Sequence, residues 1–172
     1  MQHEMIHDVL TSQYLAALET LRRAVAACPS EAWIESPPRL SAFWRVAHHT
    51  LFFADLYLHE EQSFKPWPKH VDDHHDLGPF VDEAGTRPPR IGTPTTRDEM
   101  LEFADYVKAR VPGAVRAMPL DGPSGWHWQR INKLEMHVYN IRHIQHHAAV
   151  LVARLRERAG IEVDWVGKGR PA

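Results

Sequence analysis

The sequence predicts an all-α protein, built as a four-helix bundle. Three observations support this class: apolar residues recur at helical spacing in four long segments, no segment alternates between apolar and polar residues in a way that supports a sheet, and proline gathers between the four segments. There is no internal repeat and no low-complexity tract. A chain of 172 residues suits one core, so a single domain is predicted over residues 1–172.

The first two helices are predicted at about 4–27 and 42–62. Pro29 ends the first, and a proline-containing loop follows to Leu40. Ser41 is the expected N-cap of the second helix. The apolar residues expected to face the core are Val9, Tyr14, Ala17, Leu18, Leu21 and Val25 in the first helix and Phe43, Val46, Ala47, Leu51, Ala54, Tyr57 and Leu58 in the second.

A long connection is predicted at about 63–95, where proline and glycine recur without any helical or strand period. Connections of this length without regular structure are uncommon inside a compact domain and are often functional. Here it is expected to be a crossover, which lets the helices on either side run parallel.

The third helix has a clear predicted start, because Thr96 and Glu99 form a T-x-x-E capping box ahead of an apolar run. Pro112-Gly113 is expected to kink or interrupt this helix, and Met118-Pro119 to end it.

The fourth helix is predicted from about Gln129 to Ala159, after a turn rich in glycine, proline and tryptophan. Gly160 occupies the C′ position, which favours the left-handed conformation. The tail of about 160–172 contains one short strand-like patch, Ile161–Val166.

Histidine is unusually frequent, with 13 residues against 20 lysines and arginines, which prompts a search for a metal site. His143 and His147 are four residues apart in the fourth helix, so two imidazoles project from one face and can reach one ion. Both lie off the predicted apolar face of this helix, at roughly 140° and 100° from its centre. That face comprises Leu134, Val138, Ile141, Ala148, Val152 and Leu155.

The histidine pair is expected to be secluded in a cleft at a second interface, since Met136, Tyr139 and Val150 share its side of the helix. A third ligand must come from another segment. The second helix offers His48, His49, Asp55 and His59 as candidates, and periodicity alone leaves these alternatives open.

Two segments resemble the ligand-bearing helices of the DinB-like (YfiT-like) superfamily: residues 47–58, AHHTLFFADLYL, and residues 142–151, RHIQHHAAVL. The resemblance implies a four-helix bundle with one metal ion bound by His49, His143 and His147, and it makes His146 a non-ligand neighbour. His48 beside His49 leaves a one-residue ambiguity, because only one of two adjacent helical residues faces the pair. The resemblance also implies a homodimer.

Three imidazoles leave coordination positions for water or substrate, as in catalytic rather than closed structural sites. Zinc is the first expectation, and nickel or iron(II) also suit imidazole. The resemblance implies a metal-dependent transferase or hydrolase acting on a small substrate, such as a thiol-linked molecule. Two alternatives stay open: a non-catalytic metal-binding or stress-response protein, and a helical interaction module with vestigial ligands. No phosphate loop, G-x-S-x-G elbow or CxxC motif offers another chemical centre.

Other polar and aromatic residues receive structural interpretations. The run Lys69–Asp76, KHVDDHHD, is expected to be solvated, although its histidines and aspartates could in principle bind a metal. Asp55 and His59, on the His48 face, are expected at the surface. The tryptophans Trp44, Trp126 and Trp128 are interpreted as core or interface residues rather than a pocket lining, and Cys28 as inert.

The composition argues against nucleic acid and membranes as partners. A formal net charge of −2 gives no basic footprint for nucleic acid, and no apolar run approaches the ~18 residues of a membrane span. One cysteine permits no intramolecular disulfide, and residues 1–5 lack the features of a secretory signal, so a cytoplasmic location is expected.

Overall fold

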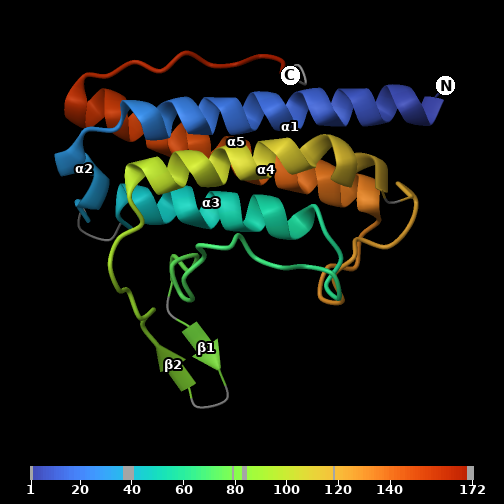
Figure 1. The fold of residues 1–172 in the computed structure, drawn as a ribbon, viewed down its shortest axis with the longest axis horizontal. Coiled ribbons are helices and arrows are strands. Elements are labelled where there is room, and N and C mark those ends of the chain that lie inside the picture. Colours follow the sequence, from blue (N-terminus) through green and yellow to red (C-terminus); the bar gives the residue numbers. More distant parts are fainter. Residues whose placement is uncertain (1, 37–40, 79, 83–84, 118, 170–172) are drawn as a thin grey trace.

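The computed structural model describes residues 2–36, 41–78, 80–82, 85–117 and 119–169, and the described chain is mostly helical, as the all-α prediction requires (Figure 1). Within the described segments, no helix has both the length and the apolar character needed to cross a membrane. The elements in chain order are α1 (Gln2–Ala27), α2 (Ser30–Ile34), α3 (Phe43–Tyr57), β1 (Phe80–Asp82), β2 (Gly85–Arg87), α4 (Arg97–Ala117) and α5 (Lys133–Ala159).

The four long helices lie side by side (Figure 1). Helix α1 packs against α4 and α5, and α3 packs against the same two helices. Helices α3 and α4 run in one direction while α1 and α5 run in the other, so the segment between α3 and α4 is the expected crossover. The predicted tail after Gly160 returns along α1, where the Gly169 amide donates to the Ser12 carbonyl at 3.0 Å.

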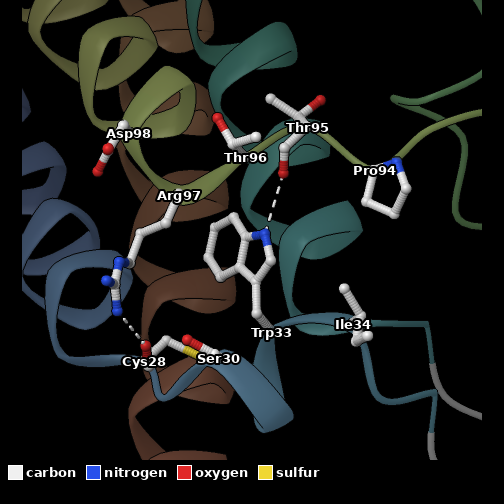
Figure 2. A pocket seen from close by; sticks show the side chains of 9 residues that line it. All are labelled: Cys28, Ser30, Trp33, Ile34, Pro94, Thr95, Thr96, Arg97 and Asp98. Atoms are coloured by element: carbon white, nitrogen blue, oxygen red, sulfur yellow. Dashed lines mark hydrogen bonds between the residues drawn. The ribbon is translucent and has the colours of Figure 1, made fainter.

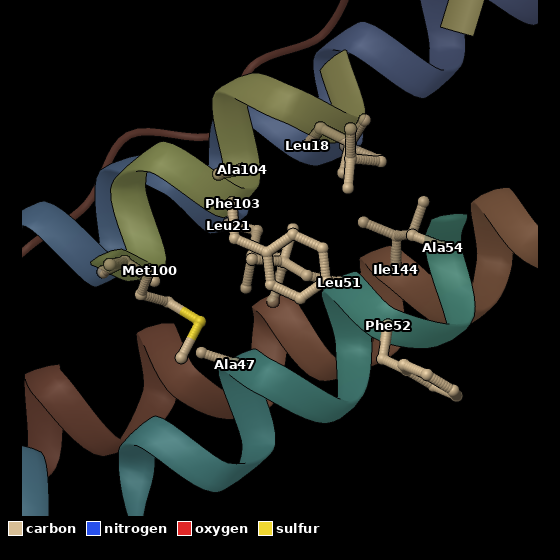
Figure 3. Close-up of a cluster of buried hydrophobic side chains, with 14 of the residues drawn as sticks. Leu18, Leu21, Ala47, Leu51, Phe52, Ala54, Met100, Phe103, Ala104 and Ile144 are labelled. Carbon is tan, nitrogen blue, oxygen red and sulfur yellow. The ribbon is translucent and has the colours of Figure 1, made fainter. Parts of the chain in front are cut away.

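All four long helices contribute to one core. Figure 3 shows the Phe103 ring at its centre, among aliphatic side chains from the neighbouring helices. Phe52 points from the opposite side of α3, away from this cluster. Burying a large apolar side chain stabilises a fold by about 1.5–3 kcal/mol. The fully buried members drawn there include Leu18, Leu21, Ala47, Leu51, Met100, Phe103, Ala104 and Ile144.

The two predicted loops and the tail differ from expectation. The loop predicted from Pro29 contains the short helix α2, and its residues 37–40 lie outside the described part. The crossover contains a small antiparallel hairpin, β1–β2, which Figure 1 shows projecting away from the helices. Strands of three residues are too short to produce a recognisable period. The strand-like patch Ile161–Val166 forms no strand, and residues 170–172 lie outside the described part.

Several helix boundaries also differ. Ala42, not Ser41, is the N-cap of α3, and α3 ends at Tyr57 rather than near Gln62. Helix α4 continues through Pro112, so the predicted interruption is wrong. Pro112 lies near the end of α4, where few helical residues follow it. Met118, the first residue of its predicted end, lies outside the described part.

The local end signals were predicted correctly at two places. The Glu99 amide donates to Thr96 Oγ1 at 3.3 Å, while the Thr96 amide donates to Glu99 Oε2 at 2.9 Å, which is the expected capping box. Gly160 is left-handed at φ 64° and ends α5.

The predicted core face of α5 is correct only in part. Ala148 and Leu155 are buried as expected, but Val138 is 46% exposed, and residues on a neighbouring side of the helix are buried as well. Three of those are polar, which hides the apolar period: Lys133, His137 and Asn140 are fully buried. Val9 of α1 is likewise exposed, at 55%. The buried residues of α5 are Lys133, Met136, His137, Asn140, Ile144, Ala148, Leu151 and Leu155.

Asn132 begins α5, since its side chain accepts a hydrogen bond from the Glu135 amide at 2.8 Å. We expect Asn132→Ala to lower the free energy of unfolding by about 1 kcal/mol, because the first turn then loses its cap. Asn132→Ser, which restores an acceptor, should recover most of the loss in urea unfolding. Equal losses in the two variants would show that capping is not the cause.

His137 links stability to pH. Its ring accepts from or donates to the Tyr14 hydroxyl at 3.0 Å, and burial, with the nearby charges of Lys133 and His7, lowers its pKa to about 3 from an ordinary 6.5. Between these values the unfolded chain binds the proton and the folded chain does not. The free energy of unfolding of metal-free protein should therefore fall as pH drops from 6.5 toward 3.

The variant His137→Gln should remove up to about 1.4 kcal/mol per pH unit from that slope, measured by urea unfolding at several pH values in EDTA. His3→Gln, at an exposed residue of the same chain, is the control and should leave the slope unchanged. Identical slopes for wild type and His137→Gln would contradict the assignment.

Candidate metal centre

Three histidines from two helices converge at one point of the structure. His49 lies on α3, and His143 and His147 lie one turn apart on α5. Their candidate ligand atoms all lie within 4.8 Å of one another, and His49 Nε2 is 3.1 Å from His143 Nε2. Two nitrogens bound tetrahedrally to zinc at about 2.0–2.1 Å are about 3.3 Å apart. One pair of nitrogens therefore has the spacing of two zinc ligands, and the third ring lies close enough for the three to be able to hold one ion. We call these three residues the triad.

Buried polar contacts between α3 and α5 fix the relative positions of the triad residues. Asn140 Nδ2 donates to the Ala54 carbonyl at 2.9 Å, and Lys133 Nζ donates to the Tyr57 carbonyl at 3.0 Å. Both donors are fully buried, so a slip of either helix would leave polar groups without partners. These contacts hold α3 and α5 in one register, and in that register the three histidine rings lie close together.

His48, the alternative ligand on α3, faces a different part of the molecule. It is fully buried, with Nδ1 3.2 Å from Thr95 Oγ1 and Nε2 3.1 Å from His70 Nδ1. Adjacent helical residues point about 100° apart, so His49 alone of the two faces the α5 pair. Of the two candidates, His49 is the one that the structure groups with His143 and His147.

The crossover segment orients His49. His49 Nδ1 lies 2.7 Å from the carbonyl oxygen of His75, so that nitrogen donates and Nε2 is left free to bind a cation. The His75 ring stacks on Phe52 with centroids 3.9 Å apart and planes 16° from parallel. Neither the hydrogen bond to the His75 carbonyl nor the stacking of the His75 ring could be predicted from the sequence, because contacts made by an irregular segment follow no periodic pattern.

The triad histidines are neutral at physiological pH. Burial lowers the pKa of His49 to about 4, that of His143 to about 3 and that of His147 to about 4. Repulsion among the rings adds to the effect of burial on the pKa of His143 and His147. Neutral imidazole is the form that binds metal, so no proton has to leave first.

The other predicted polar candidates form no second cluster of this kind within the described residues. The Lys69–Asp76 run is not simply solvated: Asp73 and His74 are buried at 8% and 1% exposure. Their burial packs the crossover against α3. Asp55, expected at the surface, is 1% exposed and pairs with Arg110 and His59 at 3.2 and 3.3 Å.

Aromatic side chains other than tryptophan surround the triad. The Phe53 ring lies 4.8 Å from that of His49, and the Tyr57 ring lies 6.5 Å from that of His143. Trp44 and Trp126 are buried, as the core interpretation expects, whereas Trp128 is 48% exposed. A groove of about 540 Å³ reaches His143 from solvent and is lined by Tyr139, Arg142, His143, Gln145, His146 and Ala149.

Cys28 lies in a separate pocket of about 290 Å³ between α2 and the start of α4 (Figure 2). Arg97 Nη1 donates to the Cys28 carbonyl at 2.9 Å, and Trp33 Nε1 donates to the Thr95 carbonyl at 3.0 Å. Burial raises the pKa of the Cys28 thiol to about 11, which agrees with the inert interpretation.

Comparisons of the chain with protein-family models, curated proteins and solved structures gave no match. The resemblance to DinB-like proteins therefore stays a prediction.

The two adjacent histidines of α3 should respond differently to substitution. His49→Ala should weaken zinc binding by more than about 100-fold, beyond the 10–100-fold typical of losing an outer partner of a ligand. His48→Ala should keep zinc affinity within a few-fold but lower thermal stability, because His48 is buried. Zinc competition titration and thermal unfolding measure the two effects, and the opposite pattern would show that His48 is the ligand.

Proposed function

We propose that this protein is a DinB-like four-helix bundle that binds one divalent metal ion through His49, His143 and His147. We further propose that it acts as a metal-dependent transferase or hydrolase on a small substrate, such as a thiol-linked molecule. The observation that supports this most is the convergence of three neutral, half-buried imidazoles from two distant segments. Zinc fits the donor set first, and nickel and iron(II) are compatible with it.

The donor set favours an open site. Three imidazole nitrogens leave at least one position for another ligand, and no carboxylate or cysteine of the described residues joins them. A bound divalent ion supplies a Lewis acid that polarises a substrate carbonyl or lowers the pKa of a bound water or thiol.

The chain's own residues position and shield this centre. The His75 carbonyl holds His49 in the tautomer that presents Nε2, which fixes one ligand before any ion arrives. Phe53 and Tyr57 cover one side of the rings and limit water there. The groove beside His143 leaves the other side accessible to a small molecule.

A homodimer is part of the proposal, as the resemblance implies. On α5, Val138 and Tyr139 are 46% and 39% exposed. These apolar side chains lie beside the groove, where a second copy of the chain would cover them.

One observation favours a non-catalytic alternative. Catalytic zinc sites commonly include a carboxylate that acts as general base or orients a histidine ligand. Within the described residues, no carboxylate hydrogen-bonds to a triad ring. A metal ion that only stabilises the α3–α5 contact is therefore the second candidate function.

Metal analysis separates these possibilities. Protein reconstituted with zinc and then dialysed should retain about one ion per chain, and His147→Ala should retain far less. If the ion is structural, its removal should cost several kcal/mol of stability. If it is catalytic, removal should abolish metal-dependent turnover of thiol-linked test substrates while thermal unfolding changes little. Wild-type protein that binds no metal even after reconstitution would refute both candidates and leave a helical interaction module.

A further inference from the structure

The triad, held between α3 and α5, has chemically different neighbours on its two sides along the helices. Toward the end of α3 the triad is bordered by aromatic rings, with Tyr57 and Tyr139 5.5 Å apart. Toward the start of α3 it is bordered by two arginines: Arg45, one turn before His49, and Arg154, two turns after His147. The antiparallel packing of the helices brings both arginines to the same end.

Arg154 is a half-buried cation without an acidic partner in the described part of the chain. Its Nη1 donates to the Ser41 carbonyl at 2.8 Å, and within the described residues no carboxylate lies at ion-pair distance from it. Burial lowers the pKa of Arg154, and repulsion from Arg158 adds to the effect. A guanidinium in this state is poorly compensated and gains most from an incoming anion.

Arg45 also has spare hydrogen-bonding capacity. Its Nη2 contacts the Asp76 carbonyl oxygen, while its Nε is buried and has no hydrogen-bond partner. Burial lowers the pKa of Arg45, and the negative charge of Asp76 partly offsets this effect. The charge of Arg45 is therefore better compensated than that of Arg154.

The arginines act on the triad electrostatically. After burial, the pKa of His49 is lowered by the charge of Arg45 among other causes, and that of His147 by the charge of Arg154. No carboxylate is among the groups that shift the pKa of these two rings. A divalent ion on three neutral imidazoles would keep its full positive charge and add to this field.

We propose that the ligand of the triad carries an oxyanion, a carboxylate or a phosphate, which Arg154 binds with help from Arg45 while another atom of the ligand reaches the metal. This inference rests on the proposed function and adds a substrate class to it. The planar guanidinium fork matches both oxyanions and binds them by charge-assisted hydrogen bonds.

The spacing defines the shape of the ligand. Arg154 follows His147 by two helical turns, a rise of about 10 Å, and side chains on α5 lean back toward its N-terminus and hence toward the triad. The anionic group therefore binds one to two turns from the metal. An elongated ligand suits this separation, with a metal-binding atom at one end and the oxyanion at the other.

Cobalt(II)-substituted protein provides the test, because a thiolate bound to cobalt gives a charge-transfer band. The probes are three thiols of matched length: 6-mercaptohexanoate, 6-mercaptohexyl phosphate and the neutral 6-mercaptohexanol. We expect at least one anionic probe to bind at least about tenfold more tightly than the neutral one. The carboxylate and phosphate arms show which oxyanion is preferred.

The matched variants are Arg154→Gln and Arg130→Gln. The glutamine side chain in Arg154→Gln keeps a donor for the Ser41 carbonyl but removes the charge, so this variant should lose most of the preference. Arg130 is exposed in the turn before α5 and lies outside the groove, so Arg130→Gln should leave the preference intact. Thermal unfolding verifies that both variants fold, and Arg45→Gln, expected to weaken the preference partly, provides a second test.

Each outcome separates the two proposals. Cobalt binding with equal affinity for all three thiols overturns this inference and leaves the proposed function standing. A preference that survives in both Arg154→Gln and Arg45→Gln overturns the assignment to the arginine pair. Failure of wild-type protein to bind cobalt overturns both.

Discussion

The antiparallel contact of α3 with α5 is the constraint on which the candidate site depends. Asn140 and Lys133 of α5 each donate to a backbone carbonyl of α3 from fully buried positions. Leaving such a donor or acceptor unpaired costs about 1–3 kcal/mol, so one register is strongly preferred. A rotation of α3 by one residue, about 100°, would present His48 to α5 in place of His49.

The same contact divides neighbouring histidines between two roles. His48 joins Thr95 and His70 beneath the crossover, and burial lowers its pKa to about 2. His49 turns to α5 and receives its orientation from the His75 carbonyl. The crossover is therefore bound to both histidines, which explains how a segment without long regular elements is held near the site.

Local signals predicted much of the fold and the pairing of His143 with His147, the resemblance pointed to His49, and tertiary contacts decided the rest. The Thr96–Glu99 box and Gly160 specify helix ends within a few residues, so sequence alone finds them. The core face of α5 was predicted only in part, because Lys133, His137 and Asn140 are buried by partners that only the folded chain supplies. The stacking of His75 on Phe52 joins an irregular segment to a helix, and no periodicity reports it.

Several of the buried polar atoms that lack partners among the described residues lie where the site and its supporting segment meet. Arg45 Nε, His75 Nδ1 and His143 Nδ1 are buried without hydrogen-bond partners, whereas buried polar atoms in native proteins are normally paired. A fold selected for stability alone would replace such groups with apolar ones at little cost. Of these atoms, Arg45 Nε lies on a residue one turn before His49, and an anionic ligand beside the triad would supply the partner that this nitrogen lacks.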